Sequence, residues 1–130
     1  MISPPNARRR RRATVTTVAK LEHYSFGRVV VDGQVHTRDL IVLPGRVVPN
    51  WWRQQGHSLV VQDLEEVRDE LPERLIVGCG AHGQLKPHPA VLQALGERGI
   101  EVETLDTPEA VKRYRESDER RTAAALHLTC

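Results

Sequence analysis

The first hydrophobic segments of the chain have the spacing of β-strands. Residues 29–31 are all valine, and the Asp32-Gly33 pair that follows favours a type I′ hairpin turn, because both of its positions take positive φ. Residues 34–37 then return as a second strand, and residues 39–43 form a third. The pattern predicts an N-terminal β-meander that contains a hairpin.

The hydrophobic period lengthens after residue 60, and helices then alternate with strands. Residues 62–71 place Leu64, Val67 and Leu71 on one helical face. The remaining pattern predicts a strand at 74–78, a helix at 88–99, a strand at 100–105, a helix at 107–117 with Thr107 as its N-cap, and a strand at 122–128. Such alternation is typical of a sheet covered by helices, and the N-terminal hairpin makes the sheet mixed. We expect a single three-layer α/β domain with a mixed central sheet flanked by helices.

Charge separates the N-terminus from the rest of the chain. The net charge of the 130 residues is +2, but residues 1–20 hold six basic and no acidic side chains, whereas residues 21–130 hold 13 basic and 17 acidic ones. We expect residues 1–14, with the run Arg8–Arg12, to form a disordered basic tail, and residues 15–130 to form the domain. A mildly acidic domain argues against nucleic-acid binding by the globular part.

The sequence shows no membrane span, no secretory signal and no metal-binding spacing. A span needs about 20 apolar residues, and no such run occurs, even after the basic N-terminus. Cys79 and Cys130 lack metal-like spacing, and the histidines form neither HxH nor HxxxH, so we expect no metal. A reduced, cytoplasmic protein is the simplest interpretation. A mitochondrial location is the alternative, because transit peptides are also rich in arginine.

A glycine-rich segment follows the apolar run that begins at residue 74. Gly78, Gly80 and Gly83 match the G-x-G-x-x-G spacing of dinucleotide-binding loops. In such loops a helix starts at the third glycine, and its free N–H groups hold the pyrophosphate. Here Pro87 and Pro89 delay the helix and remove donors, so the spacing does not favour a dinucleotide.

A methyl-donor site and an anion site are the other interpretations of this segment. It resembles the first motif of class I methyltransferases, but Ile76 stands where those enzymes usually carry an acid. We therefore expect no cofactor. An anion site stays open, because glycine-rich turns after strands can form backbone nests. The candidate ligand-binding residues are Gly78, Cys79, Gly80, Gly83 and Lys86.

Three residues, Cys79, His82 and His127, have reactive side chains but do not make up a complete catalytic set. Cys79 and His82 are spaced as a conceivable nucleophilic pair, although a small residue in a tight turn is the simpler interpretation of Cys79. His127 interrupts the apolar pattern of the last strand, where a hydrogen-bonded histidine is more common than a catalytic or metal-binding one. We assign no catalytic residue. Whether the chain is an enzyme stays open, with a non-enzyme favoured.

Both tryptophans lie in one segment, VVPNWWRQQGH. Because adjacent side chains diverge, we expect one of Trp51 and Trp52 to lie in the core. The other would be exposed: Trp52, with Arg53 and His57, would form an anchor for a partner protein, since Trp and Arg are enriched in binding hot spots. The alternative is that both tryptophans pack over a sheet end.

Several segments together resemble a known family of small α/β domains. They are YSFGRVVVDGQVHTRDLIVLP, VVPNWWRQQGH, LIVGCGAHG, PHPAVLQALGERGIEVETLDTPEAVKRY and AAALHLTC, and the resemblance covers about residues 22–130. The family, of unknown function, includes the adipogenesis-associated domain-containing protein and mitochondrial complex I assembly factor three. The resemblance implies a three-layer α/β fold, no established catalytic residue and no cofactor. For the mitochondrial member it implies action through protein partners.

Two functions follow from these observations. The first is a non-catalytic α/β domain that acts through protein–protein contacts, as an assembly factor does. The alternative is a small-molecule or anion-binding protein, or an enzyme, that uses the glycine-rich loop at residues 78–86.

Overall fold

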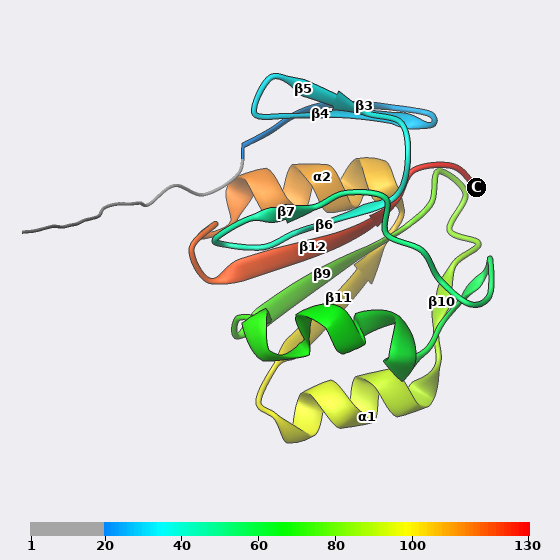
Figure 1. Ribbon diagram of the computed structural model, residues 1–130, viewed down its shortest axis with the longest axis vertical. Helices are drawn as coiled ribbons and strands as arrows, with labels where there is room; N and C mark the ends of the chain where they lie inside the picture. Colours follow the sequence, from blue (N-terminus) through cyan, green and yellow to red (C-terminus); the bar gives the residue numbers. More distant parts are fainter. Residues whose placement is uncertain (1–19) are drawn as a thin grey trace, which may run out of the picture.

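The computed structural model describes residues 20–130, which form three layers (Figure 1). The middle layer is a five-stranded sheet in the order β11-β9-β12-β6-β7. Its strands in chain order are β6 (Leu40–Val42), β7 (Val47–Val48), β9 (Arg74–Cys79), β11 (Glu101–Leu105) and β12 (Thr122–His127). β9 pairs in parallel with β11 and β12, whereas β6 and β7 run antiparallel to their neighbours. The sheet is therefore mixed, as predicted. The predicted tail at 1–14 lies outside the described residues.

The two α-helices lie on opposite faces of this sheet because of the order in which its parallel strands are connected. β9 leads through α1 (Pro89–Glu97) to β11 on one side, and β11 leads through α2 (Thr107–Glu116) to β12 on the other side. Since such crossovers are almost always right-handed, reversing their direction moves the second helix to the opposite face. The helices accordingly contribute to two separate cores, with Val91 and Leu95 from α1 in one, and Ala110, Val111 and Tyr114 from α2 in the other.

A second, three-stranded antiparallel sheet lies beside α2, at the top of Figure 1. It consists of β3 (Leu21–Ser25), β4 (Arg28–Val31) and β5 (Gln34–His36). The predicted hairpin turn is confirmed, since Asp32 and Gly33 have φ of 52° and 79°.

The predicted meander is wrong in one respect, because β6 does not pair with β5. It crosses to the central sheet instead, where it lies between β12 and β7. The burial of the two strands explains the choice: all three residues of β6 are buried, as an interior strand requires, whereas β5 is largely exposed at a sheet edge.

The segment predicted as a helix at 62–71 is a 3₁₀-helix, η1 (Val61–Glu70), which lies on the α1 side of the sheet. A 3₁₀-helix has three residues per turn, so residues three apart share a face. Val61, Leu64 and Val67 have this spacing and pack against the core. The spacing of three explains the tighter helix, and it leaves Leu71 beyond the helix end.

Two smaller features complete the fold near the glycine-rich loop. β8 (Ser58–Leu59) and β10 (Lys86–Pro87) form a short parallel pair, which ties residues 57–60 to the end of that loop. α1 starts at Pro89, well after Gly83, as the prolines predicted. Within residues 20–130, no helix combines the length and the apolar character needed to cross a membrane.

Candidate functional site

The carboxyl ends of β9, β11 and β12 meet at one edge of the sheet, where open α/β sheets usually bind ligands. The glycine loop, residues 78–86, leaves β9 at this edge. Thr107, the first residue of α2, is fully buried at this edge of the sheet. Its Oγ1 accepts a hydrogen bond from the Gly80 N–H at 2.8 Å and donates one to the His127 carbonyl oxygen at 2.6 Å. The prediction that Thr107 is the N-cap of α2 is therefore wrong. Its side chain joins β9 to β12, and Asp106 takes the cap position.

Backbone N–H groups of the glycine loop are largely engaged by the chain itself. Four of them donate to carbonyl oxygens: Ala81 to Thr129 at 2.6 Å, Gly83 to Gly80 at 3.2 Å, Gln84 to Cys130 at 3.1 Å, and Leu85 to Cys79 at 3.0 Å. A carboxylate also lies over the loop, since a Cβ added at Gly83 would stand 2.5 Å from Asp106 Oδ1. An anion nest needs free donors and no opposing acid. The geometry of the loop therefore gives an anion little to bind, although Lys86 is exposed.

Cys79 and His82 do not share an environment. Cys79 is buried, and burial raises the pKa of its thiol, with the carboxylate of Asp106 adding to the rise against the opposite effect of Lys86. His82 is exposed, and its ring lies 6.4 Å from that of Phe26. A thiol held in its protonated form is a poor nucleophile. The arrangement therefore supports the structural interpretation of Cys79.

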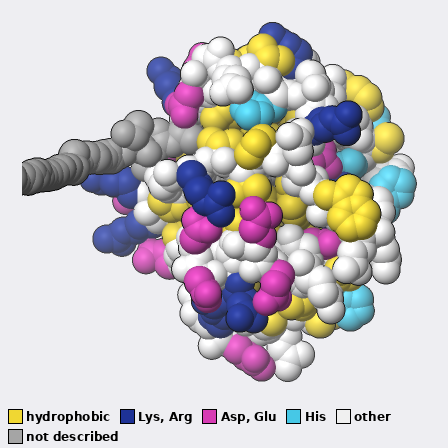
Figure 2. Space-filling model, viewed as in Figure 1, with side chains coloured by type: hydrophobic (Ala, Val, Ile, Leu, Met, Phe, Trp, Pro, Cys, Tyr) yellow, Lys and Arg dark blue, Asp and Glu magenta, His cyan; other side chains and the backbone are white. Residues whose placement is uncertain are grey.

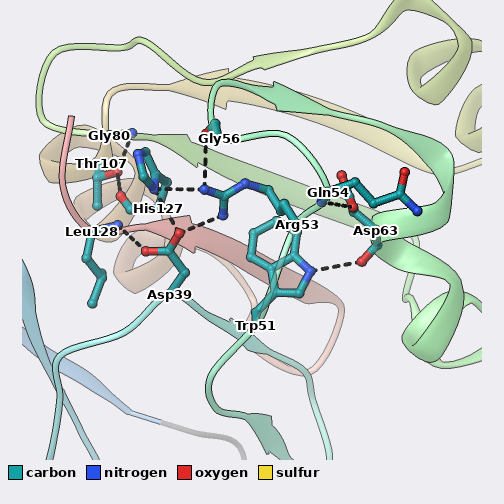
Figure 3. Close-up of polar contacts among 10 residues, drawn as sticks. All are labelled: Asp39, Trp51, Arg53, Gln54, Gly56, Asp63, Gly80, Thr107, His127 and Leu128. Carbon is teal, nitrogen blue, oxygen red and sulfur yellow. Dashed lines mark hydrogen bonds and ion pairs between the residues drawn. The ribbon is translucent and has the colours of Figure 1, made fainter.

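The most distinctive polar group in the structure is a largely buried cluster of Asp39, Arg53 and His127 (Figure 3). Arg53 Nη1 donates to Asp39 Oδ2 at 2.6 Å, and Arg53 Nη2 lies 3.1 Å from His127 Nδ1. His127 Nδ1 is 2.8 Å from Asp39 Oδ2, so a proton on Nδ1 would be donated to the carboxylate. Asp39 Oδ1 accepts the Leu128 N–H at 2.9 Å. One carboxylate thus joins the start of β6, the end of β12 and the segment after β7.

Hydrogen bonds keep the Asp39 carboxylate ionised. Burial acts to raise the pKa of Asp39, but the hydrogen bonds from His127, the Leu128 N–H and Arg53 outweigh it, and the pKa lies below its ordinary value. Two atoms of the cluster, Arg53 Nε and His127 Nε2, are buried with no hydrogen-bond partner within residues 20–130.

A carboxylate-oriented imidazole is also what general-base catalysis uses. His127 Nε2 is closed to solvent, however, and the ring packs against the backbone of Gly80, where an added Cβ would stand 2.9 Å from His127 Cδ2. A substrate would reach this atom only if the surrounding chain moved. The cluster is therefore built to position chain segments.

The segment that the cluster positions is the Trp loop, residues 49–57. Trp51 is 7% exposed, and its Nε1 donates to the Asp63 carbonyl oxygen at 2.8 Å. Asp63 also accepts the Gln54 N–H at 3.1 Å, and the Trp51 N–H donates to the Asp39 carbonyl at 2.8 Å. Arg53 packs its guanidinium 5.0 Å from the Trp51 ring centroid. These contacts fix the residues before and after Trp52, so the backbone at Trp52 is held on both sides.

Trp52 itself points outward and is 76% exposed. It borders a hollow of about 260 Å³ with Arg38, Asp39, Asn50 and Trp51. Figure 2 shows hydrophobic and histidine side chains along the right-hand margin of the molecule, whereas most charged side chains gather at the left and bottom.

The structure divides the predicted partner-binding residues between the interior and the surface. Trp51 is the core tryptophan and Trp52 the exposed one, as the divergence of adjacent side chains predicted. Only 6% of the Arg53 side chain is exposed, so Arg53 is not part of an exposed anchor, and its guanidinium packs against the buried ring of Trp51. His57 is exposed, and its carbonyl oxygen accepts the Lys86 N–H.

Asp39 is the residue of this cluster that sequence reasoning missed. Its only local signal is an acid placed directly before a strand that is buried throughout. Its partners are remote: His127 is 88 residues away along the chain and Arg53 is 14 away. His127 was marked by its place in an apolar strand, and the expected hydrogen-bonded strand-end histidine is confirmed.

The protein is a small three-layer α/β domain. The carboxyl ends of its parallel strands, where such domains often bind ligands, are occupied by polar groups of the chain itself. The chain belongs to the family described as protein of unknown function (DUF498/DUF598), whose model matches residues 21–127. The more specific resemblance to the adipogenesis-associated protein and to complex I assembly factor three stays a prediction.

Solved structures share the fold over most of the chain. The hypothetical protein PH1505 from Pyrococcus horikoshii OT3 is 29% identical with a TM-score of 0.73, and the match covers 85% of this chain and 99% of that one. MT938 is 30% identical with a TM-score of 0.67, covering 86% and 99%. A Bordetella pertussis protein described as a Mth938-like domain is 20% identical with a TM-score of 0.69, covering 98% and 91%.

Proposed function

We propose that this chain is a non-catalytic binding domain that contacts another protein through Trp52, in the manner of an assembly factor. The observation that carries the proposal is the exposure of Trp52 between two residues whose side chains are buried. Tryptophan is a large hydrophobic residue that gains from burial, and it is among the residues most enriched in binding hot spots.

The rigidity of the Trp loop supports this role. Backbone and side-chain hydrogen bonds hold Trp51 and Gln54, and the ion pair to Asp39 holds Arg53. A side chain presented on a fixed loop loses little conformational entropy when a partner covers it. Such preorganisation favours recognition of a protein surface by the loop.

The competing proposal is that the glycine loop binds a small anion. Its position at the carboxyl ends of parallel strands favours this, but its engaged N–H groups and the Asp106 carboxylate weigh against it. Thermal-shift measurements with inorganic phosphate and with nucleotides test it directly. A ligand at 100 times its Kd would stabilise the fold by about 2.7 kcal/mol; we expect no shift.

The test of the Trp52 contact is site-specific photo-crosslinking in native lysate. A photoreactive amino acid replaces Trp52 in one variant and Leu92 in a second, which serves as the matched control because Leu92 is also exposed and hydrophobic but lies on α1. We expect a discrete crosslinked product from position 52 and none from position 92. The crosslinked protein is identified, purified and titrated against the wild-type chain.

A second variant measures how much the side chain contributes. Trp52→Ala should weaken binding of the crosslinked protein about 30-fold, which corresponds to a hot-spot contribution of about 2 kcal/mol. Equal crosslinking from both positions, or unchanged affinity of Trp52→Ala, would contradict the proposed contact.

A further inference from the structure

Among residues 20–130, two sheet edges without a pairing strand border one groove beside the Trp loop. β5 is an edge strand of the small sheet and β7 is an edge strand of the central sheet. Residues of both line a hollow of about 430 Å³, which continues past Arg38 and Asn50 into the hollow at Trp52. Edge strands carry backbone groups that can pair with another extended chain.

The hydrogen-bond alternation of antiparallel pairs shows which backbone groups are free. Val31 and Gln34 flank a two-residue turn and form a hydrogen-bonded pair, so the next pair, Val30 with Val35, is not hydrogen-bonded. The N–H and C=O of Val35 therefore point away from β4. On β7 the Leu43 N–H bonds the Arg46 carbonyl at 2.8 Å, which by the same alternation turns the backbone groups of Val47 away from β6.

The side chains in the groove are mostly polar. Gln34 and His36 lie opposite Val31 and Val29 in the ladder, so they share the face on which those valines are buried, and both line the groove. An apolar ligand would find few contacts here, whereas a peptide backbone would find donors and acceptors.

Opposite charges stand at the two ends of β5. Asp32 lies at the hairpin turn, where its Oδ1 accepts the Lys20 N–H. Arg38 lies at the other end, next to the Trp52 hollow, and is exposed with no ion pair to any residue in 20–130. An unpaired arginine beside a free strand edge is complementary to an acidic side chain of an incoming strand.

We propose that the groove between β5 and β7 binds an extended segment of the partner protein, which pairs its backbone with Val35 and places an acidic side chain at Arg38. The inference rests on the proposed function, because the same partner would continue onto Trp52. It names the partner's recognition element as an acidic, extended peptide added to a sheet edge.

Selection of peptides from a displayed library of random linear sequences on the wild-type chain tests this proposal. We expect the selected peptides to share an acidic residue, and the amide of Val35 to become protected from hydrogen exchange when they bind. Arg38→Glu should weaken these peptides about tenfold. Lys112→Glu is the matched control, because Lys112 is an exposed cation on α2, and it should leave their affinity unchanged.

A backbone variant separates strand pairing from charge attraction. Val35→Pro removes an N–H that the β4 ladder does not use, and proline is tolerated on edge strands. It should weaken the peptides by a similar factor. If this variant does not fold, the hydrogen-exchange protection of Val35 in the wild type carries the same information.

Failure of this inference differs from failure of the proposed function. Selection that yields no peptide, peptides that bind Arg38→Glu as well as wild type, or no protection at Val35 would each overturn the groove proposal. If the crosslinked partner is lost with Trp52→Ala but binds Arg38→Glu and Val35→Pro normally, the Trp52 contact stands and the strand addition is wrong. If peptides bind the groove but position 52 crosslinks nothing, the strand addition stands and the Trp52 contact is wrong.

Discussion

The glycine loop and the Trp loop both have sequences that suggest function, but the structure uses them in opposite ways. The glycine loop turns its backbone groups inward, onto Thr107 and the carbonyls of residues 129 and 130. The Trp loop turns its polar groups inward too, but it leaves one large hydrophobic side chain, Trp52, in solvent. The glycine loop uses most of its backbone N–H groups in bonds to the chain itself, whereas the Trp loop keeps an apolar surface that a partner could cover.

The difference shows why residue type alone does not identify a site. Glycines at the end of a strand indicate a sharp turn and a close approach of backbone, and that approach can be to a ligand or to the chain itself. Here the chain fills the space. A tryptophan with buried neighbours on both sides is more informative, because the fold holds its neighbours and leaves it exposed.

The largest effect is expected from Gly80→Ala, which tests whether the glycine loop is closed. Gly80 has φ of +99°, and an added Cβ would lie 2.2 Å from the backbone carbon of Cys130. Strain and overlap together should cost on the order of 4 kcal/mol of unfolding free energy. The matched control is Gly96→Ala in α1, where an added Cβ meets nothing within 4 Å and should stabilise the helix. Urea denaturation of both variants measures the contrast, and a tolerated alanine at position 80 would mean that the loop is open.

The second effect is expected from Asp39→Asn, which removes the charge that holds the Trp loop. Arg53 would then be a buried cation without its counter-ion, and we expect a loss of about 3 kcal/mol. The control is Glu70→Gln, which breaks the ion pair between Arg46 and Glu70. Because both side chains of this pair are nearly half exposed, the change should affect stability little. If both variants lost the same small amount, the cluster would be only another surface ion pair.

Local signals gave most of the fold, because the elements they predict depend on neighbouring residues. The Asp32-Gly33 turn needs only two residues that accept positive φ, and the helix start at Pro89 needs only a fixed φ. Two of the departures have tertiary causes. β6 leaves the meander because its three buried residues require an interior position, and Thr107 leaves the cap position because Gly80 and His127 need its hydroxyl.

The candidate site could be predicted only in part. The outward tryptophan follows from the alternation of adjacent side chains, but the inward turn of Arg53 depends on Asp39 and His127, which lie at opposite ends of the folded chain. No pattern within a short window joins residues 88 positions apart. The groove beside β5 was not predicted for the same reason, since it appears only once β6 has moved to the other sheet.

The third effect depends on pH and isolates the ionised form of Asp39. Because the pKa of Asp39 in the fold lies below its ordinary value of 3.8, its ionisation stabilises the folded state above that value, and this contribution is lost as the pH falls through the folded pKa. We expect the difference in unfolding free energy between wild type and Asp39→Asn to shrink as the pH falls into the acid range where Asp39 becomes protonated. Urea denaturation of both proteins from neutral pH into strong acid measures it. A difference that grew in acid would contradict the assignment.

The smallest effect on stability is expected from Trp52→Ala. A small effect would show that the fold does not need this side chain, in contrast to the glycine loop. A side chain that is 76% exposed contributes little to the core, so the unfolding free energy should change by no more than about 0.5 kcal/mol. Trp51→Ala is the matched control at the neighbouring position and should cost about 3–5 kcal/mol, because it empties a buried aromatic site. Urea denaturation measures both, and acrylamide quenching of the single-tryptophan variants Trp51→Phe and Trp52→Phe shows which ring solvent reaches. Equal destabilisation by the two alanine variants would place Trp52 in the fold's own packing and remove the reason to expect a partner there. A stable Trp52→Ala variant that no longer binds the crosslinked protein would show that the fold does not need this side chain and that recognition does.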